Sequence, residues 1–321
     1  MSSPRSVRPP TLDEVHHAAR FIARILPPTP LAAPADATSP VLKLEGLQPT
    51  GSFKVRGALA ALESLAPDRA VVTASAGNHA LGIAYAATRL RRRATVVTST
   101  TAAEAKTAAI RRFAVELIQA GNSFDDAESR ALSLGGRDDC HYVSAYNDPY
   151  VIAGQASIGF ELGRQLEGPL TVVCGVGGGG LASGLGLWAT TRSDVRIVGV
   201  ESAASTALSA SIQAGRQISM TIGPTLADGL AGNIEPGSVT IDLVGRYVHD
   251  LVTVSEDEIS SAIRYLALER GVVAEGAGAV SVAAVLAGRV RDTAQTVAVV
   301  SGRNISPAKL GGILASGCRH P

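Results

Sequence analysis

Short apolar runs rich in β-branched residues alternate along the chain with longer Ala-rich stretches. The runs are almost continuously apolar, as expected for strands that are buried on both faces of a parallel sheet. The longer stretches predict helices that cover such sheets, and they include Ala80–Leu90, Tyr150–Leu166, Ile259–Glu269 and Val280–Leu286. The runs that we predict to be strands are Val41–Leu44, Ala70–Thr73, Ala94–Thr98, Val115–Gln119, Tyr142–Ser144, Thr171–Cys174, Arg196–Val200, Leu251–Val254 and Thr296–Val300.

This alternation predicts an α/β fold with two open, mostly parallel twisted sheets that carry helices on both faces. Nine strands are many for a single sheet in a chain of 321 residues. No linker-like segment divides the chain into two consecutive parts. We therefore expect a small domain inserted within a larger one. An N-terminal helix over about 12–25 should precede them and end at the proline-rich segment Pro27–Pro30.

The balance of charge argues against two classes of partner. The chain has 29 Lys and Arg residues against 28 Asp and Glu residues, which gives a net charge of +1. A surface that binds nucleic acid or an anionic membrane needs a strong excess of basic residues, so we expect neither partner. The uncharged segment Leu170–Thr191 is as long as a membrane span, but its seven glycines would leave backbone groups unpaired in lipid.

The cysteines and the N-terminus bear on the cellular compartment. Cys140, Cys174 and Cys318 are too few for a disulfide framework, and their spacing is not that of a metal site. The N-terminal residues lack the apolar core of a secretory signal. We therefore expect a soluble, cytoplasmic protein with no structural metal.

A glycine-rich loop follows the predicted strand Thr171–Cys174 and precedes a helix. Such a loop lets backbone N–H groups converge on an anion, and the dipole of the helix adds to the attraction. A phosphate site is therefore expected, formed by Gly177, Gly178, Gly179, Gly180 and Leu181. Gly175, Gly177 and Gly180 also match a dinucleotide fingerprint, with Glu201 about 20 residues further on, so the loop alone does not identify its ligand.

Lys54 lies beside Phe53, at the predicted start of a helix that follows the turn Pro49–Gly51. A cation is disfavoured near a helix N-terminus, so Lys54 is poorly placed for a purely structural role. Burial at this point would lower the pKa of its amine and make it able to form a Schiff base. A reactive lysine together with a phosphate site suits pyridoxal 5′-phosphate.

Two further loops follow predicted strands, where open α/β sheets bind their ligands. The first holds Ser75, Gly77, Asn78 and His79, whose small side chains and exposed amides suit a substrate carboxylate. The second begins at Ser301, whose hydroxyl suits a hydrogen bond to a ring nitrogen or a helix cap.

Together these segments resemble the fold-type II pyridoxal-phosphate enzymes, specifically the threonine and serine dehydratases and serine racemase. The resemblance extends over nearly the whole chain. Its motifs are Lys43–Lys54, Ser75–His79, the glycine-rich loop, Leu226–Gly229 and Ala274–Gly276.

The resemblance implies a role for each candidate residue. Lys54 would bind the cofactor covalently, with Phe53 against the ring, Asn78 on the ring 3′-oxygen and Ser301 on the pyridine nitrogen. The residues Gly177–Leu181 would hold the phosphate, and Ser75, Gly77 and His79 would receive the substrate carboxylate. It also implies a homodimer, with a small domain at 70–147 inserted in a cofactor-binding domain of residues 1–69 and 148–321.

The activity that this resemblance implies is an α,β-elimination. A β-hydroxy amino acid such as L-threonine or L-serine would lose its hydroxyl and yield a 2-oxo acid and ammonia. A neutral serine at the pyridine nitrogen makes the ring a weaker electron sink than an aspartate would, which favours prompt loss of the β-substituent.

Three residues depart from the pattern of the related enzymes. Ala76 stands where serine racemase has a serine base, so racemisation is not favoured. Ala207 stands where a second carboxylate would complete a divalent cation site with Glu201, so we expect no divalent metal. Arg303 replaces a glycine, and its guanidinium is a candidate for binding an acidic or extended substrate.

Several alternatives stay open at this point. They are a dehydratase for a specialised β-hydroxy amino acid, an amino-acid racemase and a β-replacement synthase on the same fold. A nicotinamide-dependent oxidoreductase would use the glycine fingerprint and Glu201 but leave Lys54 and Ser301 without a role. Because the sequence ends at Pro321, we expect no C-terminal regulatory domain.

Overall fold

A computed structural model describes residues 5–137, 139–290 and 294–316. Within them the larger sheet has six strands in the order β1–β2–β10–β7–β8–β9. All neighbouring strands run parallel except β1, which pairs antiparallel with β2. The strands are β1 (Leu31–Ala32), β2 (Val41–Leu44), β7 (Leu170–Gly175), β8 (Val195–Ser202), β9 (Asp250–Val254) and β10 (Gln295–Val300).

The smaller sheet has four parallel strands in the order β5–β4–β3–β6. They are β3 (Ala70–Ala74), β4 (Ala94–Thr98), β5 (Glu116–Gln119) and β6 (Cys140–Tyr142). Every strand of this sheet lies within the segment 70–147, while the segments before and after it supply the larger sheet. The two parallel-rich sheets confirm the predicted fold class.

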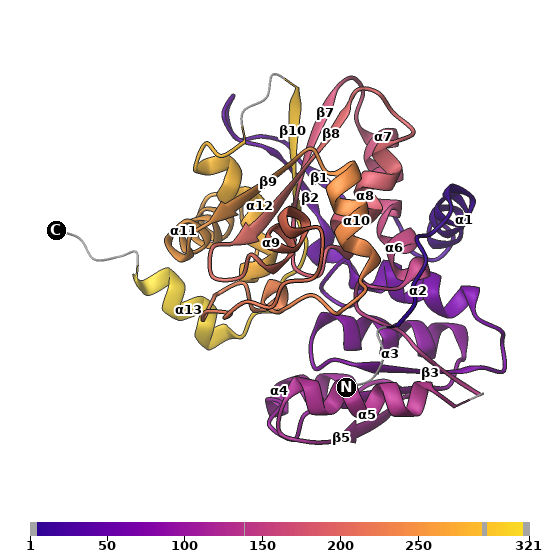
Figure 1. The fold of residues 1–321 in the computed structure, drawn as a ribbon. Helices are drawn as coiled ribbons and strands as arrows, with labels where there is room; N and C mark the ends of the chain where they lie inside the picture. Colours follow the sequence, from indigo (N-terminus) through magenta and orange to yellow (C-terminus); the bar gives the residue numbers. More distant parts are fainter. Residues whose placement is uncertain (1–4, 138, 291–293, 317–321) are drawn as a thin grey trace.

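Helices cover both faces of each sheet, as the parallel strands require. In the larger sheet, α11 and α12 lie on one side, and α7, α8 and α10 lie on the other (Figure 1). The helices are α1 (Leu12–Ile22), α2 (Lys54–Ser64), α3 (Asn78–Leu90), α4 (Glu104–Ile110), α5 (Phe124–Gly135), α6 (Pro149–Gln155), α7 (Ser157–Gln165), α8 (Gly180–Ala189), α9 (Ala207–Ala214), α10 (Val239–Tyr247), α11 (Glu256–Leu268), α12 (Gly276–Leu286) and α13 (Pro307–Ser316), with short 3₁₀ turns η1 (Glu45–Leu47) and η2 (Asp228–Leu230).

Local sequence accounts for where several helices begin. Capping boxes start α1 at Thr11, α5 at Ser123 and α11 at Ser255. In each, the hydroxyl accepts the backbone N–H of the acidic residue three positions later, whose carboxylate accepts the backbone N–H of the capping residue. The side chain of Asp148 caps α6, which has a proline in its first turn.

Several predicted bounds differ from the structure: α1 ends at Ile22 instead of continuing to about residue 25, and α11 and α12 begin three and four residues earlier than predicted. Three further differences have a local cause. The two-residue strand β1 is too short to show a pattern in the sequence. The predicted helix Tyr150–Leu166 is divided at Ala156, where the Ser157 hydroxyl donates to the oxygen of Gly154. Strand β6 ends at Tyr142 because the next carbonyl, that of Val143, accepts side-chain hydrogen bonds instead.

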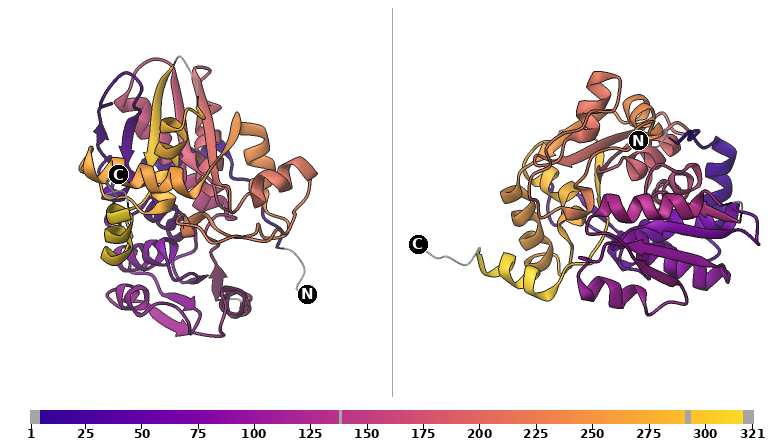
Figure 2. Two further views of the ribbon diagram at one scale, coloured as in Figure 1. Left: turned by 90° about the vertical axis from the view of Figure 1, so that its left-hand side faces the viewer. Right: turned by 60° about the horizontal axis from the view of Figure 1, so that its bottom comes forward.

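The order of the strands indicates where each sheet would bind a ligand. Ligands bind open α/β sheets where the connections leave two adjacent strands in opposite directions. That point lies between β7 and β10 in the larger sheet and between β3 and β6 in the smaller one. The glycine-rich loop follows β7, Ser301 follows β10 and Ser75 follows β3. Figures 1 and 2 show the smaller sheet beneath this edge of the larger one, with α2 and α3 side by side between them.

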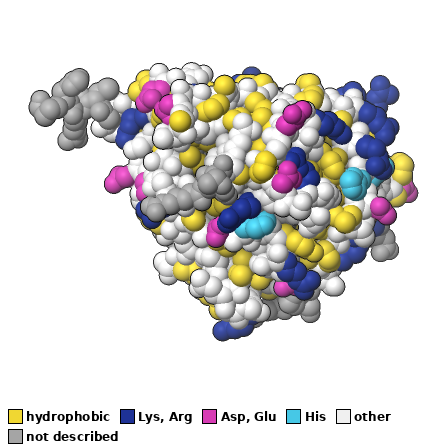
Figure 3. Space-filling view, turned by 90° about the horizontal axis from the view of Figure 1, so that it is seen from above, with side chains coloured by type: hydrophobic (Ala, Val, Ile, Leu, Met, Phe, Trp, Pro, Cys, Tyr) yellow, Lys and Arg dark blue, Asp and Glu magenta, His cyan; other side chains and the backbone are white. Residues whose placement is uncertain are grey.

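One face of the molecule and the lengths of the helices bear on partners. Figure 3 shows a face on which basic, acidic and hydrophobic side chains are interspersed. Among the described residues, no helix is both long enough and apolar enough to span a membrane.

Candidate active site

Lys54 is the first residue of α2, and its side chain is partly buried. The Nζ atom donates to the backbone oxygen of Ala145 at 2.8 Å, just beyond β6. It also lies 5.3 Å from the centre of the Phe53 ring. Burial lowers the pKa of the Lys54 amine to about 8, although the negative charge of Glu275 opposes this shift. About a tenth of the amine is therefore neutral, and so nucleophilic, at pH 7, a far larger share than for a lysine with an ordinary pKa.

A buried network of charges fixes α2 behind this lysine. The guanidinium of Arg56 donates to both oxygens of Glu161, at 2.7 and 2.9 Å. Lys43, which has no exposed side-chain surface, reaches the same carboxylate at 2.6 Å. The network joins α2 to β2 and α7, so the helix that carries Lys54 cannot shift without breaking buried ion pairs.

The glycine-rich loop presents a row of free donors. The hydrogen bonds of the described residues give no protein acceptor to the backbone N–H groups of Gly177, Gly178, Gly179, Gly180 and Leu181. Helix α8 begins at Gly180, so its dipole points its positive end at the same place. Donors without acceptors at a helix N-terminus fit an anionic phosphate, as predicted.

The loop after β3 supplies donors for a second anion. The Ser75 hydroxyl accepts the N–H of Gly77 at 3.1 Å and keeps its own hydrogen free to donate. The next helix, α3, begins at Asn78, so the N–H groups of its first turn are free as well. Ser75 and Gly77 therefore lie together, but the N–H of Gly77 is directed to the serine oxygen.

The side chain of His79 is buried and uncharged. Burial and, to a smaller extent, the positive charge of Lys54 lower the pKa of His79 to about 3. Its Nε2 lies 3.3 Å from the oxygen of Val143, and its Nδ1 has no partner among the described residues. A neutral, buried imidazole cannot pair with a carboxylate as a cation, so any contact of His79 with the substrate would use its backbone N–H.

Ser301 is buried directly after β10, where the sequence analysis predicts it. Its hydroxyl donates to the backbone oxygen of Ala277 at 3.2 Å. The hydroxyl hydrogen of Ser301 would therefore have to rotate away from Ala277 to donate to a ring nitrogen. Its own backbone oxygen accepts the N–H of Phe53 at 3.0 Å, which connects this strand end to the start of α2.

The sequence analysis missed Glu275 and Asn304, which both bind the side chain of the predicted residue Asn78. Asn78 donates to a carboxylate oxygen of Glu275 at 2.6 Å, and its own oxygen accepts a hydrogen bond from Asn304 at 2.6 Å. Burial raises the pKa of Glu275 to about 7, although the bond from Asn78 opposes the shift. Glu275 stands in the segment Ala274–Gly276, which resembles the dehydratases, and Asn304 follows Ser301 by three residues, but no local pattern of the sequence gives either of them a role.

The position of Arg303 gives no support to its predicted contact with substrate. Its side chain is exposed, and its β-carbon packs over Gly46. Within the described part of the chain, its guanidinium makes no hydrogen bond or ion pair. Only its backbone joins the site, through a bond of 2.8 Å from its N–H to the oxygen of Gly51.

Glu201, the acidic residue of the possible dinucleotide fingerprint, binds the start of a helix instead. One of its carboxylate oxygens accepts the backbone N–H groups of Leu208 and Ser209, at 3.2 and 3.3 Å, in the first turn of α9. Its carboxylate thus caps a helix within the fold. No group of three or more His, Cys, Asp or Glu side chains in the described residues could hold a metal ion.

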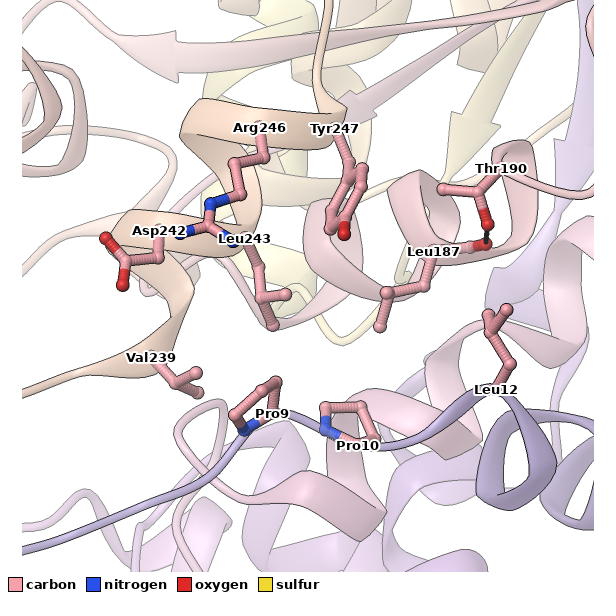
Figure 4. Close-up of a pocket in the computed structure, with 10 residues that line it drawn as sticks. All are labelled: Pro9, Pro10, Leu12, Leu187, Thr190, Val239, Asp242, Leu243, Arg246 and Tyr247. Carbon is pink, nitrogen blue, oxygen red and sulfur yellow. Dashed lines mark hydrogen bonds between the residues drawn. The ribbon is translucent and has the colours of Figure 1, made fainter.

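Two cavities lie near the surface. One of about 260 Å³ adjoins Ser75 and Ala76 and extends along the ends of β4 and α5. The other, of about 650 Å³, lies between Pro9–Leu12 and helices α8 and α10, and it contains none of the candidate site residues (Figure 4). The first cavity is therefore the one connected with the site.

Comparison with known proteins identifies the family. A family described as "Pyridoxal-phosphate dependent enzyme" matches residues 22–302. An L-threonine ammonia-lyase from Thermotoga maritima is 39% identical over 316 residues, covering 96% of this chain and 79% of that protein. The catabolic L-threonine dehydratase TdcB from Escherichia coli is 36% identical and covers 84% of each chain.

Solved structures agree with this family. The processed form of threonine deaminase isoform 2 from Solanum lycopersicum matches with a TM-score of 0.85 and 30% identity, covering 98% of this chain and 96% of that one. Serine racemase from Dictyostelium discoideum matches with a TM-score of 0.85 and 28% identity, covering 92% of this chain and 99% of that one. The chain belongs to the pyridoxal-phosphate-dependent enzyme family, and the predicted resemblance is confirmed.

The residues present fit this cofactor. The free N–H groups of the glycine-rich loop suit its phosphate, and the amine of Lys54, with its lowered pKa, suits a covalent bond to its aldehyde. The hydroxyl of Ser301 and the side-chain amide of Asn78 would be available to polar atoms of its ring.

Proposed function

We propose that this enzyme is a pyridoxal-phosphate-dependent ammonia-lyase that converts L-threonine or L-serine into a 2-oxo acid and ammonia. The observation that carries the proposal is the partly buried amine of Lys54, which donates to the backbone oxygen of Ala145 just beyond strand β6 of the smaller sheet. Relatives at 39% and 36% identity that are named L-threonine ammonia-lyase and L-threonine dehydratase support the substrate class.

The protein supplies a base and two anion sites to this reaction. When bound, the cofactor withdraws electrons from the α-carbon of the substrate, which weakens its C–H bond and lets the β-hydroxyl leave. Lys54 would hold the cofactor covalently and, once the substrate amine displaces it, would take the α-proton as a general base. Its lowered pKa of about 8 lets the amine both accept and release a proton near neutral pH.

We further propose that Ser75 and the first turn of α3 bind the substrate carboxylate. The free hydroxyl hydrogen of Ser75 and the N–H groups at the start of α3 are suitable donors. A carboxylate held here would fix the α-carbon relative to Lys54. Ala76 offers no proton donor or acceptor beside this site, which favours elimination over racemisation.

The enzyme is also proposed to act in the cytoplasm as a homodimer. The compartment is supported by the free cysteines Cys140 and Cys174. Light scattering after size-exclusion chromatography would measure the mass in solution, and a monomer would contradict the proposed dimer.

Product analysis tests the proposed reaction. The holoenzyme is incubated with L-threonine, with L-serine and with β-hydroxy amino acids that have larger side chains, and 2-oxo acid and ammonia are measured. We expect equal amounts of the two products from the first two substrates. Lys54→Arg keeps the charge and length but removes the nucleophile, and it should lower the rate by at least about 10³-fold.

Other products would assign the alternatives. Formation of D-serine without 2-oxo acid would show a racemase, and a thioether formed from an added thiol would show a β-replacement synthase. Release of 2-oxo acid from the larger substrates alone would show a specialised dehydratase.

A further inference from the structure

The side-chain amide of Asn78 is held at both ends by residues from distant segments. Its Oδ1 accepts a hydrogen bond from Nδ2 of Asn304 at 2.6 Å, and that Nδ2 also donates to the oxygen of Thr50 at 2.9 Å. On the other side, Nδ2 of Asn78 donates to Oε1 of Glu275 at 2.6 Å. Since an amide nitrogen carries two hydrogens, this arrangement leaves Asn78 one free N–H.

The two partners oppose rotation of this amide by half a turn. In the rotated state, Oδ1 of Asn78 would face the side chain of Glu275, and its Nδ2 would face the amide nitrogen of Asn304. The two amide nitrogens are both donors, and the ionised form of Glu275 is only an acceptor, so both hydrogen bonds would be lost when Glu275 is ionised. An asparagine without such partners could present either its oxygen or its nitrogen to a ligand.

The backbone is built to admit both partners. Gly51 has a φ of +75°, and a β-carbon there would collide with the side-chain oxygen of Asn304. A β-carbon on Gly302 would likewise collide with Oε1 of Glu275. The N–H of Glu275 donates to the oxygen of Gly302 at 3.1 Å, which fixes the start of α12 against this loop.

We propose that Asn304 and Glu275 are positioning residues that fix the orientation of Asn78, so that its free N–H is presented to an oxygen on the cofactor ring. This inference rests on the proposed function, because it needs pyridoxal phosphate in the site. An anionic ring oxygen is bound by an N–H donor and repelled by an amide oxygen. Asn304 and Glu275, together called the clamp, therefore hold the amide of Asn78 in the orientation that binds this oxygen before the cofactor arrives.

Cofactor binding to variants tests the clamp without measuring catalysis. Asn304→Asp keeps the shape but replaces the donor with an acceptor, which favours rotation of Asn78. We expect it to weaken the affinity of the apoprotein for pyridoxal phosphate by about tenfold and to alter the visible absorbance of the bound cofactor. Glu275→Gln, which can partner either orientation, should weaken binding in the same direction. Asn122→Asp, at an exposed loop position of the smaller sheet, is the matched control and should bind as the wild type does.

A double-variant comparison separates positioning from a general structural effect. In an Asn78→Leu background there is no amide to orient, so adding Asn304→Asp should weaken cofactor binding no further. Wild-type affinity and absorbance in both Asn304→Asp and Glu275→Gln would overturn the inference. The inference would also be overturned if the affinity of the double variant fell by the product of the two single losses, because Asn304→Asp would then act without Asn78. Failure of the wild-type apoprotein to bind pyridoxal phosphate at all would instead overturn the proposed function.

Discussion

Arg56 and Glu45 form a bidentate ion pair in which neither side chain has any exposed surface. Nε of Arg56 donates to Oε2 of Glu45 at 2.7 Å, and Nη2 donates to Oε1 at 2.8 Å. The pair joins the turn η1 to α2 only two residues after Lys54. Removing one member would leave the other charged and buried without its partner.

We therefore expect Arg56→Met to destabilise the protein by about 3–5 kcal/mol. The comparison is Arg111→Met, because Arg111 forms an ion pair with Glu104 in which both side chains are largely exposed. That change should cost no more than about 1 kcal/mol. Urea unfolding of the two variants measures the difference. Equal losses would show that the buried network does not stabilise α2.

The lowered pKa of Lys54 predicts how the apoprotein captures its cofactor. Only the neutral amine attacks the aldehyde, so the rate should rise about tenfold per pH unit below the pKa of about 8 and level off above it. A peptide lysine, with its pKa of about 10.4, should show a rate that still rises between pH 8 and 10. Stopped-flow absorbance measures both profiles. If the rate for the apoprotein also kept rising up to pH 10, burial would not have lowered the pKa of Lys54.

The raised pKa of Glu275 predicts a change of stability with pH. Burial in the fold raises the pKa of Glu275 from its ordinary value of 4.5 to about 7, so the folded state binds the proton more tightly than the unfolded state. Stability from this group is complete below pH 4.5 and is lost as the pH rises through 7. Besides the bond from Asn78, the nearby charges of Asp228, Lys106 and Lys309 act on this carboxyl.

Glu275→Gln cannot titrate and should gain stability relative to the wild type between pH 5 and 8, by up to about 3 kcal/mol. Urea unfolding of the two apoproteins across this range measures the gain. A difference in unfolding free energy that stays constant with pH would contradict the shifted pKa.

The exposed side chain of Arg303 makes it the first residue to test for substrate selection. Because its guanidinium has no polar partner among the described residues, we expect Arg303→Gly to change kcat/KM for L-threonine less than about twofold. Steady-state kinetics with L-threonine and with a β-hydroxy amino acid that has an acidic side chain would measure its role. A selective loss with the acidic substrate would restore Arg303 as a specificity residue.

Local pattern was sufficient to predict most of the fold. The strands β2 and β4 have their predicted bounds, because short runs rich in apolar and β-branched residues end at a proline or at charged or polar residues on both sides. The division at Ala156 was missed because it depends on a hydroxyl bonding to its own helix rather than on hydrophobic period.

The site was predictable only where neighbouring residues carry the chemistry. The glycine-rich loop and the start of α2 are continuous segments, and each can be interpreted from its own sequence. In contrast, the partners of Asn78 are 197 and 226 residues away in the chain, and the partner of Lys54 is a backbone oxygen. Such contacts are set by the order of the strands, which composition and periodicity do not determine.

The most direct test of the central claim is to locate the lysine that binds the cofactor. The chain has four lysines, which are Lys43, Lys54, Lys106 and Lys309. The holoenzyme is reduced with borohydride, digested and analysed by peptide mass spectrometry. The account predicts that the added mass of the reduced cofactor is found on the peptide that contains Lys54. Attachment at one of the other three lysines, or at none, would contradict it.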